Sequence, residues 1–355
     1  MGDTNLSAIT GALEQRIRRE VVKQYNRSAL TTNLLRKIDG RGKNLAWDVS
    51  LGTAGGQIFD DGQMITTFNS DQKRQATLPW AELGDAFKIT GRAEDGAQFS
   101  QTELANQWLF ELGECVTRCA DIWNTQIWNG DGTAIGGQRL LGLAMSSNGP
   151  LSATGTYANI NRAVDTQFAG IVMANGGVPR AISLDLILYG FEQVFNASGR
   201  QPTWGMTTAN IHRMLGTLTG SQRRENRDVY IRGQKLHVSM GYDSVEVNGV
   251  PVFKDKDVPT GVLTFFNDES ICIEVLPVAP SRVQRGKIMA RVPIAGLPQE
   301  QDMQGAPGMK PLTANIIQLP SPGNFDSWML NTTGGLEVVR PNAHLMIRDI
   351  QFKSS

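Results

Sequence analysis

The sequence is short of cysteine, of long apolar runs and of net charge, and each shortage excludes a class of protein. Three cysteines, Cys115, Cys119 and Cys272, cannot form an even disulfide framework, so reduced thiols are expected. No apolar stretch approaches the roughly 18 residues of a membrane span, and the amino terminus lacks the apolar core of a secretory signal. We therefore expect no membrane span, no secretory signal, and folding in a cytoplasm.

Charge of one sign is also lacking overall, but it is concentrated locally. Lys and Arg number 34, as do Asp and Glu, which argues against a protein that binds nucleic acid over its whole surface. Residues 1–43 nevertheless carry nine basic and four acidic residues in an amphipathic helical pattern. This arm is either a docked helix with a solvated basic face or a helix that faces a neighbouring subunit or packaged nucleic acid. The basic residues concerned are Arg16, Arg19, Lys23 and Arg27.

Motifs for catalysis and for phosphate binding are missing as well. The sequence has no GxSxG, HExxH or GxxxxGK[ST] motif, and Gly130 and Gly132 follow a predicted helix instead of opening one. His212, His237 and His344 are the only imidazoles, and no carboxylate, histidine and nucleophile can be assembled around them. We expect each histidine to be structural and the protein not to be an enzyme.

Two further groups could be mistaken for metal sites. Cys115 and Cys119 lie one helical turn apart without a histidine near them, so buried packing is favoured over metal binding. Asp255, Asp257 and Asp268 lie near a turn, but their spacing is not that of an EF-hand loop, and a solvated loop face is expected. The sequence thus predicts no metal and no cofactor.

What the chain does contain is a long amphipathic helix, predicted over Gln101–Trp128. Ser100 and Glu103 form a capping-box pattern at its start, and Asn129-Gly130 provides a stop. At 1.5 Å per residue the helix reaches roughly 42 Å, enough to organise a whole subunit. Its apolar residues recur every three or four positions: Leu104, Trp108, Leu112, Val116, Cys119, Trp123 and Ile127.

Before this helix, residues 44–82 have the pattern of a long hairpin with glycine-rich turns. Bulky apolar residues are few, and a two-stranded ribbon is not stable alone in water, so it is expected to lie against another molecule. Trp47, Phe68 and Trp80 are the candidate anchors at contacts between subunits, because aromatic residues are favoured there.

After the helix the sequence predicts a compact lobe that contains both helices and strands. Helical patterns cover Tyr157–Met173, Ser183–Phe195 and Thr207–Leu218. Short strands then surround Asn248-Gly249, a strong signal for a two-residue hairpin turn. Strand-like runs separated by Pro- and Gly-rich loops follow to the carboxyl terminus, and the fold class is therefore α+β.

This order of parts resembles the major capsid protein family of tailed bacteriophages, which has the Hong Kong 97 fold. The resemblance spans about residues 1–350 and rests on the order and spacing of its motifs. The residues that carry it are Trp128 to Gly132 with Leu141 to Leu143, Val247 to Asp255, Pro259, Gly261 to Asn267, and Val339 to His344.

The resemblance implies a division of the chain into named parts. These are an N-arm at 1–43, an extended E-loop hairpin at 44–82, a peripheral domain at 83–142 with its spine helix at about 100–129, an axial domain at 143–267, and strands at 268–355 that return to the peripheral domain. It also implies a possible covalent cross-link between Lys73 and a neighbour's Asn324, although Lys73 beside Arg74 is read more simply as a solvated charge.

The function implied is self-association into hexamers and pentamers of an icosahedral virion shell, assembled in the host bacterial cytoplasm. The shell encloses double-stranded DNA through weak non-specific contacts. Because the chain before Asn44 is too short to hold a scaffolding segment, a separate scaffolding protein is expected. The resemblance also implies a portal protein and a decoration protein as partners.

Two alternatives and one ambiguous cluster stay open. An encapsulin-type compartment shares the implied fold, and a soluble α/β enzyme with its site in the 143–267 lobe is the alternative of another class. Arg223, Arg224 and Arg227 form a solvated loop, a contact with acidic residues of the next subunit, or a contact with genome phosphates.

Overall fold

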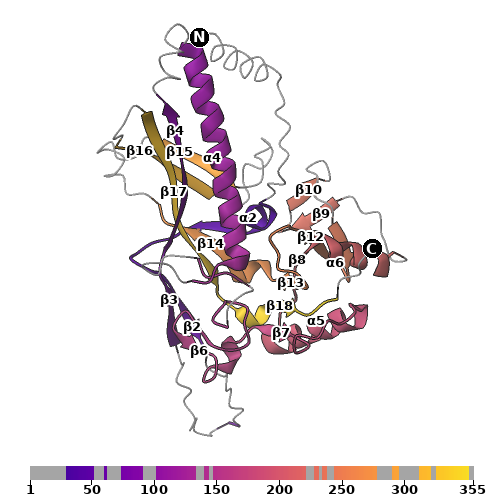
Figure 1. The fold of residues 1–355 in the computed structure, drawn as a ribbon. Helices are drawn as coiled ribbons and strands as arrows, with labels where there is room; N and C mark the ends of the chain where they lie inside the picture. The colour runs from indigo at the N-terminus through magenta and orange to yellow at the C-terminus, as the bar shows by residue number, and fades with distance from the viewer. Residues whose placement is uncertain are drawn as a thin grey trace.

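A computed structural model describes twelve stretches of the chain, which form an α+β fold (Figure 1). In Figure 1 one sheet lies along a long helix, and a second sheet lies beside the lower end of that helix. The described residues are 29–51, 60–61, 73–90, 101–132, 140–143, 147–220, 228–231, 234–237, 244–277, 290–295, 312–320 and 325–351.

The long helix, α4 (Gln101–Asn129), has 29 residues and confirms the predicted helix. Its buried side contains Leu112, Trp123 and Ile127, from the predicted stripe, which pack against β4, β17 and the short helix α2 (Leu30–Leu34). The helix ends where the amide of Gly130 donates to the carbonyl of Gln126, 2.9 Å away. Local sequence therefore set both the length and the buried side of this element.

The first sheet is assembled from parts of the chain that are far apart in sequence. Its order is β1-β14-β17-β16-β15, and β4 also pairs with β17. The 14-residue strand β17 lies at its centre and pairs antiparallel with β14, β16 and β4. The strands are β1 (Arg36–Asp39), β4 (Ala81–Thr90), β14 (Ile271–Val275), β15 (Ala290–Ala295), β16 (Leu312–Leu319) and β17 (Phe325–Val338).

The second sheet has the order β11-β12-β8-β13-β18-β7. Helix α5 (Leu184–Ser198) contacts β7 and β18, and α6 (Ala209–Leu218) contacts β11 and β12. Positive φ angles of 50° at Asn248 and 81° at Gly249 confirm the predicted two-residue turn between β11 and β12. The strands are β7 (Ile171–Met173), β8 (Trp204–Thr207), β11 (Ser244–Val247), β12 (Val250–Lys254), β13 (Leu263–Phe266) and β18 (Leu345–Ile347).

The helix predicted over Tyr157–Met173 is wrong. The segment forms the small hairpin β5 (Thr156–Tyr157) and β6 (Ile160–Asn161), a 3-10 turn η1 (Thr166–Phe168), and then β7. Ala158 and Asn159 both have positive φ, at 49° and 66°, which no helix accommodates. Tyr157, Ile160 and Phe168 are all buried, but they come from β5, β6 and η1 and not from one face of a helix.

Two ribbons stand apart from the main sheets. Strands β2 (Leu45–Ser50) and β3 (Lys73–Leu78) pair from Leu45↔Leu78 to Ser50↔Lys73, which confirms the base of the predicted hairpin. They leave the body at the bottom of Figure 1. The predicted strand around Phe68 lies outside the described residues. The second ribbon pairs β9 (Asp228–Ile231) with β10 (Gln234–His237).

The buried apolar residues fall into two clusters, one on each face of the second sheet. The larger cluster joins α2, α4, the first sheet and the loop around Tyr157 to one face, through Met206, Phe253 and Phe266. The smaller cluster packs α5 and α6 on the other face, around Phe265. Within the described residues, no helix combines the length and the apolar character needed to cross a membrane.

Candidate functional site

The described residues hold no group of three or more His, Cys, Asp and Glu that could bind a metal ion. His344 is buried, its Nδ1 accepts from the amide of Asn267 at 3.2 Å, and burial lowers its pKa to about 3. Its imidazole is therefore neutral and committed to the fold. His212 is buried on α6, and the side chain of His237 lies outside the described residues. These observations direct attention to surfaces and junctions.

The two cysteines of α4 are free and buried, as predicted for packing residues. Cys115 and Cys119 are 0 % and 2 % exposed on the side of the helix that faces the first sheet. Their mutual hydrogen bond lowers the pKa of Cys115 and raises that of Cys119. Cys272 on β14 is also free and buried, and burial raises its pKa.

The base of the β2–β3 ribbon is fixed to the loop that was predicted to be a helix. The ring of Trp47 lies 6.0 Å from that of Tyr157, and the amide of Thr77 donates to the carbonyl of Ala158 at 3.1 Å. Asn159 adds a side-chain hydrogen bond to Thr77. The ribbon therefore leaves the body with its base held on one side.

Trp47 and Trp80, the predicted anchors at contacts between subunits, both make contacts within their own chain. Trp80 is only 9 % exposed, and its Nε1 donates to the carbonyl of Gly42 at 3.2 Å. Trp47 is half-buried and packs against the core of its own chain. Both rings stabilise the root of the ribbon, because an aromatic ring at this position fills the gap that a thin ribbon leaves against the body.

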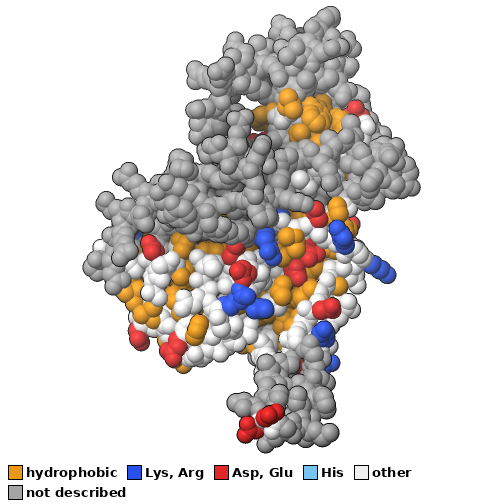
Figure 2. Space-filling view, turned by 180° about the vertical axis from the view of Figure 1, so that it is seen from behind, with side chains coloured by type: hydrophobic (Ala, Val, Ile, Leu, Met, Phe, Trp, Pro, Cys, Tyr) orange, Lys and Arg blue, Asp and Glu red, His pale blue; other side chains and the backbone are white. Residues whose placement is uncertain are grey.

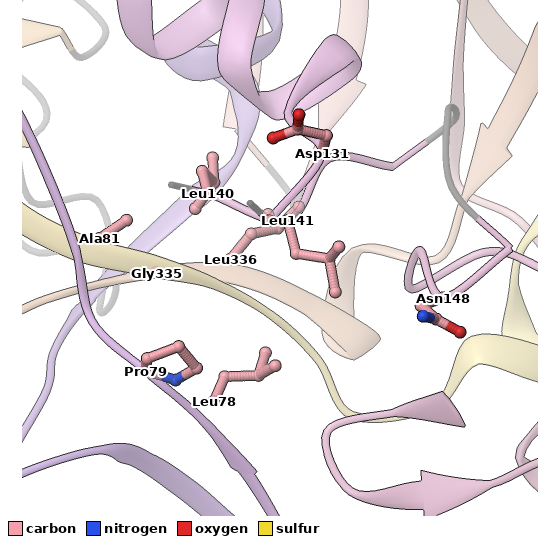
Figure 3. Close-up of a pocket in the computed structure, with 10 residues that line it drawn as sticks. Leu78, Pro79, Ala81, Asp131, Leu140, Leu141, Asn148, Gly335 and Leu336 are labelled. Carbon is pink, nitrogen blue, oxygen red and sulfur yellow. The ribbon is translucent and has the colours of Figure 1, made fainter. Parts of the chain in front are cut away.

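A cavity of about 250 Å³ lies at this root (Figure 3). Its lining is apolar apart from Asp131 and Asn148, so it suits an apolar side chain better than a charged group. Its other lining residues come from the β3–β4 connection, the segment after α4, and β17: Leu78, Pro79, Ala81, Gly132, Leu140, Leu141, Gly335 and Leu336.

A buried polar junction connects α2, α4 and the loop after β12, and Asp255 is at its centre. One carboxyl oxygen of Asp255 accepts from the amide and the hydroxyl of Thr31 at 3.0 and 2.6 Å. Asn124 Nδ2 on α4 donates to both carboxyl oxygens at 3.0 Å. Thr31 and Asp255 are separated by 224 residues, so this junction holds distant parts of the chain together.

The expectation of a solvated face at Asp255, Asp257 and Asp268 is therefore wrong for two of the three. Asp255 and Asp268 are 3 % and 7 % exposed. Asp257 is half-buried, and burial raises its pKa. Asp255 lies in a turn against α4, where Asn124 and the amide of Asp257 supply its hydrogen bonds. Asp268 begins the 3-10 turn η3 (Asp268–Ser270), and its amide donates to Thr203 Oγ1 at 3.1 Å.

Further hydrogen bonds to Trp128 and Thr32, and an ion pair at the edge, complete this junction. Trp128 Nε1 donates to Thr31 Oγ1 at 2.8 Å, and Asn124 Oδ1 accepts from the amide of Thr32 at 3.1 Å. At the edge, Lys256 Nζ lies 2.6 Å from Asp121 Oδ1. Because buried polar groups are costly when unpaired, this network admits one arrangement of the three segments.

Arg162 is the second buried polar centre. Its side chain is fully buried, its guanidinium donates to four backbone carbonyls of the segment 149–168, and it lies over the ring of Tyr157 at 5.3 Å. Burial lowers its pKa to about 10. Arg162 thereby organises the loop on which the ribbon rests. The carbonyls belong to Gly149, Pro150, Thr154 and Phe168.

We expect Arg162→Met to lower the free energy of unfolding by about 2–4 kcal/mol, since several buried carbonyls lose their donor. Urea unfolding of the subunit measures this. Arg74→Met is the matched control, because Arg74 is exposed and forms a weak ion pair with Asp165, at 4.0 Å. This substitution should change the free energy of unfolding by about 1 kcal/mol or less. Equal effects of the two substitutions would contradict the assignment.

Two carboxyl groups meet on neighbouring strands of the first sheet. Glu337 on β17 is 5 % exposed and accepts from Cys272 Sγ at 3.3 Å. Glu274 lies on β14, two residues after Cys272, and is half-buried. Burial, together with the hydrogen bond and the charge of Glu337, raises the pKa of Glu274 to about 8. The pair therefore holds a proton at neutral pH.

This pair gives stability a pH dependence with a defined sign. Between the ordinary value of 4.5 and about 8, the unfolded chain releases the proton of Glu274 while the fold retains it. The free energy of unfolding should therefore fall as pH rises through this window. Glu274→Gln should flatten that part of the profile in urea unfolding measured from pH 4 to 9. An unchanged slope in the variant would contradict the assignment.

The remaining predicted contact residues are placed as follows. Lys73 is exposed at the first position of β3, opposite Ser50. The rest of that set, including the other half of the predicted cross-link, lies outside the described residues: Arg16, Arg19, Lys23, Arg27, Phe68, Arg223, Arg224, Arg227 and Asn324.

Sequence reasoning missed the residues of the two buried polar centres. Thr31, Asn124 and Asp255 are too far apart along the chain for any spacing rule to connect them. Arg162 lies in a polar stretch that looks exposed. The one available signal was Asn124, a polar residue next to Trp123 on the buried side of an otherwise apolar helical stripe.

Comparison with known proteins gives structural likeness without sequence likeness. No protein-family model and no curated protein sequence matches the chain. The capsid asymmetric unit of cyanophage A-1(L) is similar with a TM-score of 0.71 at 16% identity, over 93% of this chain and 95% of that one.

Two further solved structures are similar at lower scores. The SrpI encapsulin complex of Synechococcus elongatus PCC 7942 has a TM-score of 0.54 at 12% identity and covers 98% of both chains. The capsid of Myoviridae phage XM1 has a TM-score of 0.51 at 10% identity, over 95% and 98%. The predicted α+β fold of phage capsid proteins is thus confirmed, because the likeness extends over nearly the whole length of each chain.

Proposed function

We propose that this chain is the major capsid protein of a tailed bacteriophage, and that its copies form an icosahedral shell around double-stranded DNA. The observation that carries the proposal is the end-to-end likeness to the capsid protein of cyanophage A-1(L), with a TM-score of 0.71. Self-association is then the function itself, and no catalytic step is required.

The physical basis of the proposal is a rigid body with thin extensions. Helix α4 and strand β17 run together through the body, and the ribbon β2–β3 extends from it (Figure 1). A ribbon of this kind gains stability by lying on a second copy, because it buries little apolar surface of its own. Stability of the shell is then distributed over many small contacts.

Several finer assignments belong to the same proposal. Residues 1–43 act as the N-arm, 44–82 as the E-loop, 83–142 as the peripheral domain, 143–267 as the axial domain, and 268–355 as returning strands, except that β18 joins the second sheet, with β13 and β7. We place Phe68 and the arginines at 223, 224 and 227 at contacts between copies. A scaffolding protein, a portal protein and a decoration protein are the further partners, and Lys73 with Asn324 is the pair for a covalent link.

An encapsulin-type compartment is the second candidate, because the SrpI encapsulin is similar over 98% of both chains. The two candidates differ in what the shell encloses. Nuclease-protected double-stranded DNA inside purified particles indicates a phage shell, whereas a co-purified enzyme indicates a compartment.

The test of the proposal is negative-stain electron microscopy of the chain expressed alone and with its neighbouring open reading frames. Closed shells, or rings of five and six copies, are the expected result. Monodisperse monomers under every condition would overturn the proposal and turn the search to a ligand of the lobe that contains α5 and α6.

A further inference from the structure

The turn between β11 and β12 places an asparagine and a glycine at the edge of the second sheet. Asn248 and Gly249 are both exposed, and their φ angles are 50° and 81°. Strand β11 is the outermost strand of this sheet, and Val247 pairs with Val250 across the turn. A two-residue turn leaves the amides of its two central residues outside the ladder, so the backbone nitrogen of Gly249 faces solvent.

An asparagine followed by a glycine contains the groups needed for a spontaneous reaction. The glycine nitrogen attacks the asparagine Cγ, and a five-membered imide forms as the Cγ–Nδ2 bond breaks. Ammonia leaves and carries away the proton of the glycine amide. Water then opens the imide at either carbonyl and gives aspartate or isoaspartate. Water is the only co-reactant, nothing is oxidised or reduced, and glycine is favoured because no Cβ shields its nitrogen.

The chain contains four Asn-Gly pairs, and the structure distinguishes them. At the end of α4, Asn129 Nδ2 donates to the carbonyl of Asp257 at 3.3 Å, and the amide of Gly130 donates to the carbonyl of Gln126 at 2.9 Å. Both reacting groups of this pair are therefore engaged. The four pairs are 129–130, 148–149, 175–176 and 248–249.

Two other pairs also have a fixed asparagine side chain. Asn148 Oδ1 accepts from the amide of Thr156 at 3.0 Å, and Gly149 is buried. Asn175 Nδ2 donates to the carbonyl of Val178 at 2.7 Å. Ring closure requires the side chain to rotate onto the next backbone nitrogen, so these hydrogen bonds must break first.

The pair in the β11–β12 turn has no such restraint. Asn248 makes no side-chain hydrogen bond to the part of the chain that the structure describes. Nothing lies within 4 Å of the position that a Cβ on Gly249 would occupy, so the approach to its nitrogen is open. Turns at the edge of a sheet also open locally at low cost, which gives the ring-closing geometry access.

We propose that Asn248 is a site of spontaneous deamidation, and that it becomes aspartate and isoaspartate faster than the asparagines of the other three pairs. The inference goes beyond the proposed function and does not depend on it. Isoaspartate adds one carbon to the backbone, which no longer fits a two-residue connection between Val247 and Val250. Since Val247 is 1 % exposed and packs in the cluster beneath α6, the change reaches the core of this lobe.

The reaction also adds a negative charge to each modified copy. Figure 2 shows acidic and basic side chains interspersed over the described surface, seen from behind. Lys and Arg balance Asp and Glu in the whole chain, at 34 each. A modified copy is therefore separable from an unmodified one by ion exchange.

Peptide mapping of the folded full-length chain tests the proposal, because trypsin places each pair in a different peptide. After incubation at mildly alkaline pH, the peptide with Asn248 should show the mass increase of an amide-to-acid change. It should do so about fivefold faster than the other three, or more, because their hydrogen bonds must break before the ring closes. The peptides are 119–139, 140–162, 163–180 and 236–254.

The chain unfolded in guanidinium chloride is the matched control. It keeps the local sequences but loses the hydrogen bonds, so all four pairs should react at similar rates. A native chain in which another pair reacts as fast as Asn248 would overturn the proposal. The same ranking in native and unfolded chains would also overturn it, because the preference would then come from local sequence.

Asn248→Gly provides a second measurement. Glycine accepts the positive φ of this position but has no amide to lose. During the same incubation the wild type should develop an acidic fraction in ion-exchange chromatography that the variant largely lacks. Equal fractions from both would overturn the proposal. Neither measurement uses assembly, so failure of the shell function and failure of this inference are separate results.

Discussion

Asp255→Ala should lower the free energy of unfolding by about 3 kcal/mol or more. The change removes the acceptor of the Thr31 amide, the Thr31 hydroxyl and the Asn124 amide in a site that is 3 % exposed. The amide and the hydroxyl of Thr31 would then be buried without this acceptor, whereas Asn124 Nδ2 would keep only Asp257. Urea unfolding followed by circular dichroism measures the loss.

The matched control for this prediction is Asp121→Ala. Asp121 lies at the rim of the same junction, half-exposed and paired with Lys256, so its loss should cost about 1 kcal/mol or less. Asp255→Asn keeps the shape and one acceptor oxygen, and it should fall between the two. If Asp255→Ala costs no more than Asp121→Ala, the junction does not hold the three segments together.

Asp255→Ala should also reduce assembly. The junction fixes α2, and with it the start of β1, against α4 and the loop after β12. Loosening it lets α2 and the second sheet take several orientations relative to α4, and contacts between copies require one orientation. Particle yield at a temperature where the variant is still folded separates this effect from unfolding.

Replacing residues 51–72 with a two-residue Asn-Gly turn should abolish closed shells while leaving the subunit folded. The replacement keeps β2 and β3, whose Leu45 and Ala76 are fully buried, and it preserves the pairing of Ser50 with Lys73. The free energy of unfolding should therefore change little, whereas the yield of particles should fall to background, because the segment proposed to lie on a neighbour is gone.

Electron microscopy and urea unfolding of the same preparation test this prediction. A larger deletion, of residues 52–75, would also remove Lys73 to Gln75 from β3 and leave part of β2 unpaired, so it is a poorer choice. The matched control is the full-length chain with two extra residues, Asn and Gly, inserted after Gly249, in the turn that joins β11 and β12. Wild-type-like particles from the shortened hairpin would contradict the proposal that the ribbon stabilises the shell.

Elements with a strong local signal were predictable from the sequence. Helix α4 follows from a continuous apolar stripe, and the β11–β12 turn follows from Asn248 and Gly249, which tolerate positive φ. The helix predicted over Tyr157–Met173 failed, because its buried apolar residues come from β5, β6 and η1 and not from one face of a helix. Periodicity alone does not distinguish these cases.

The sequence by itself determined the long helix, the ribbon and the order of parts that made the fold recognisable, because each is encoded by residues close together in the chain. The tertiary structure alone decided which polar residues are buried. Asp255 and Thr31 are 224 residues apart, and Trp80 became a packing residue only once Gly40 and Gly335 lay against it. Burial depends on what the rest of the chain brings next to a residue, and no local pattern contains that information.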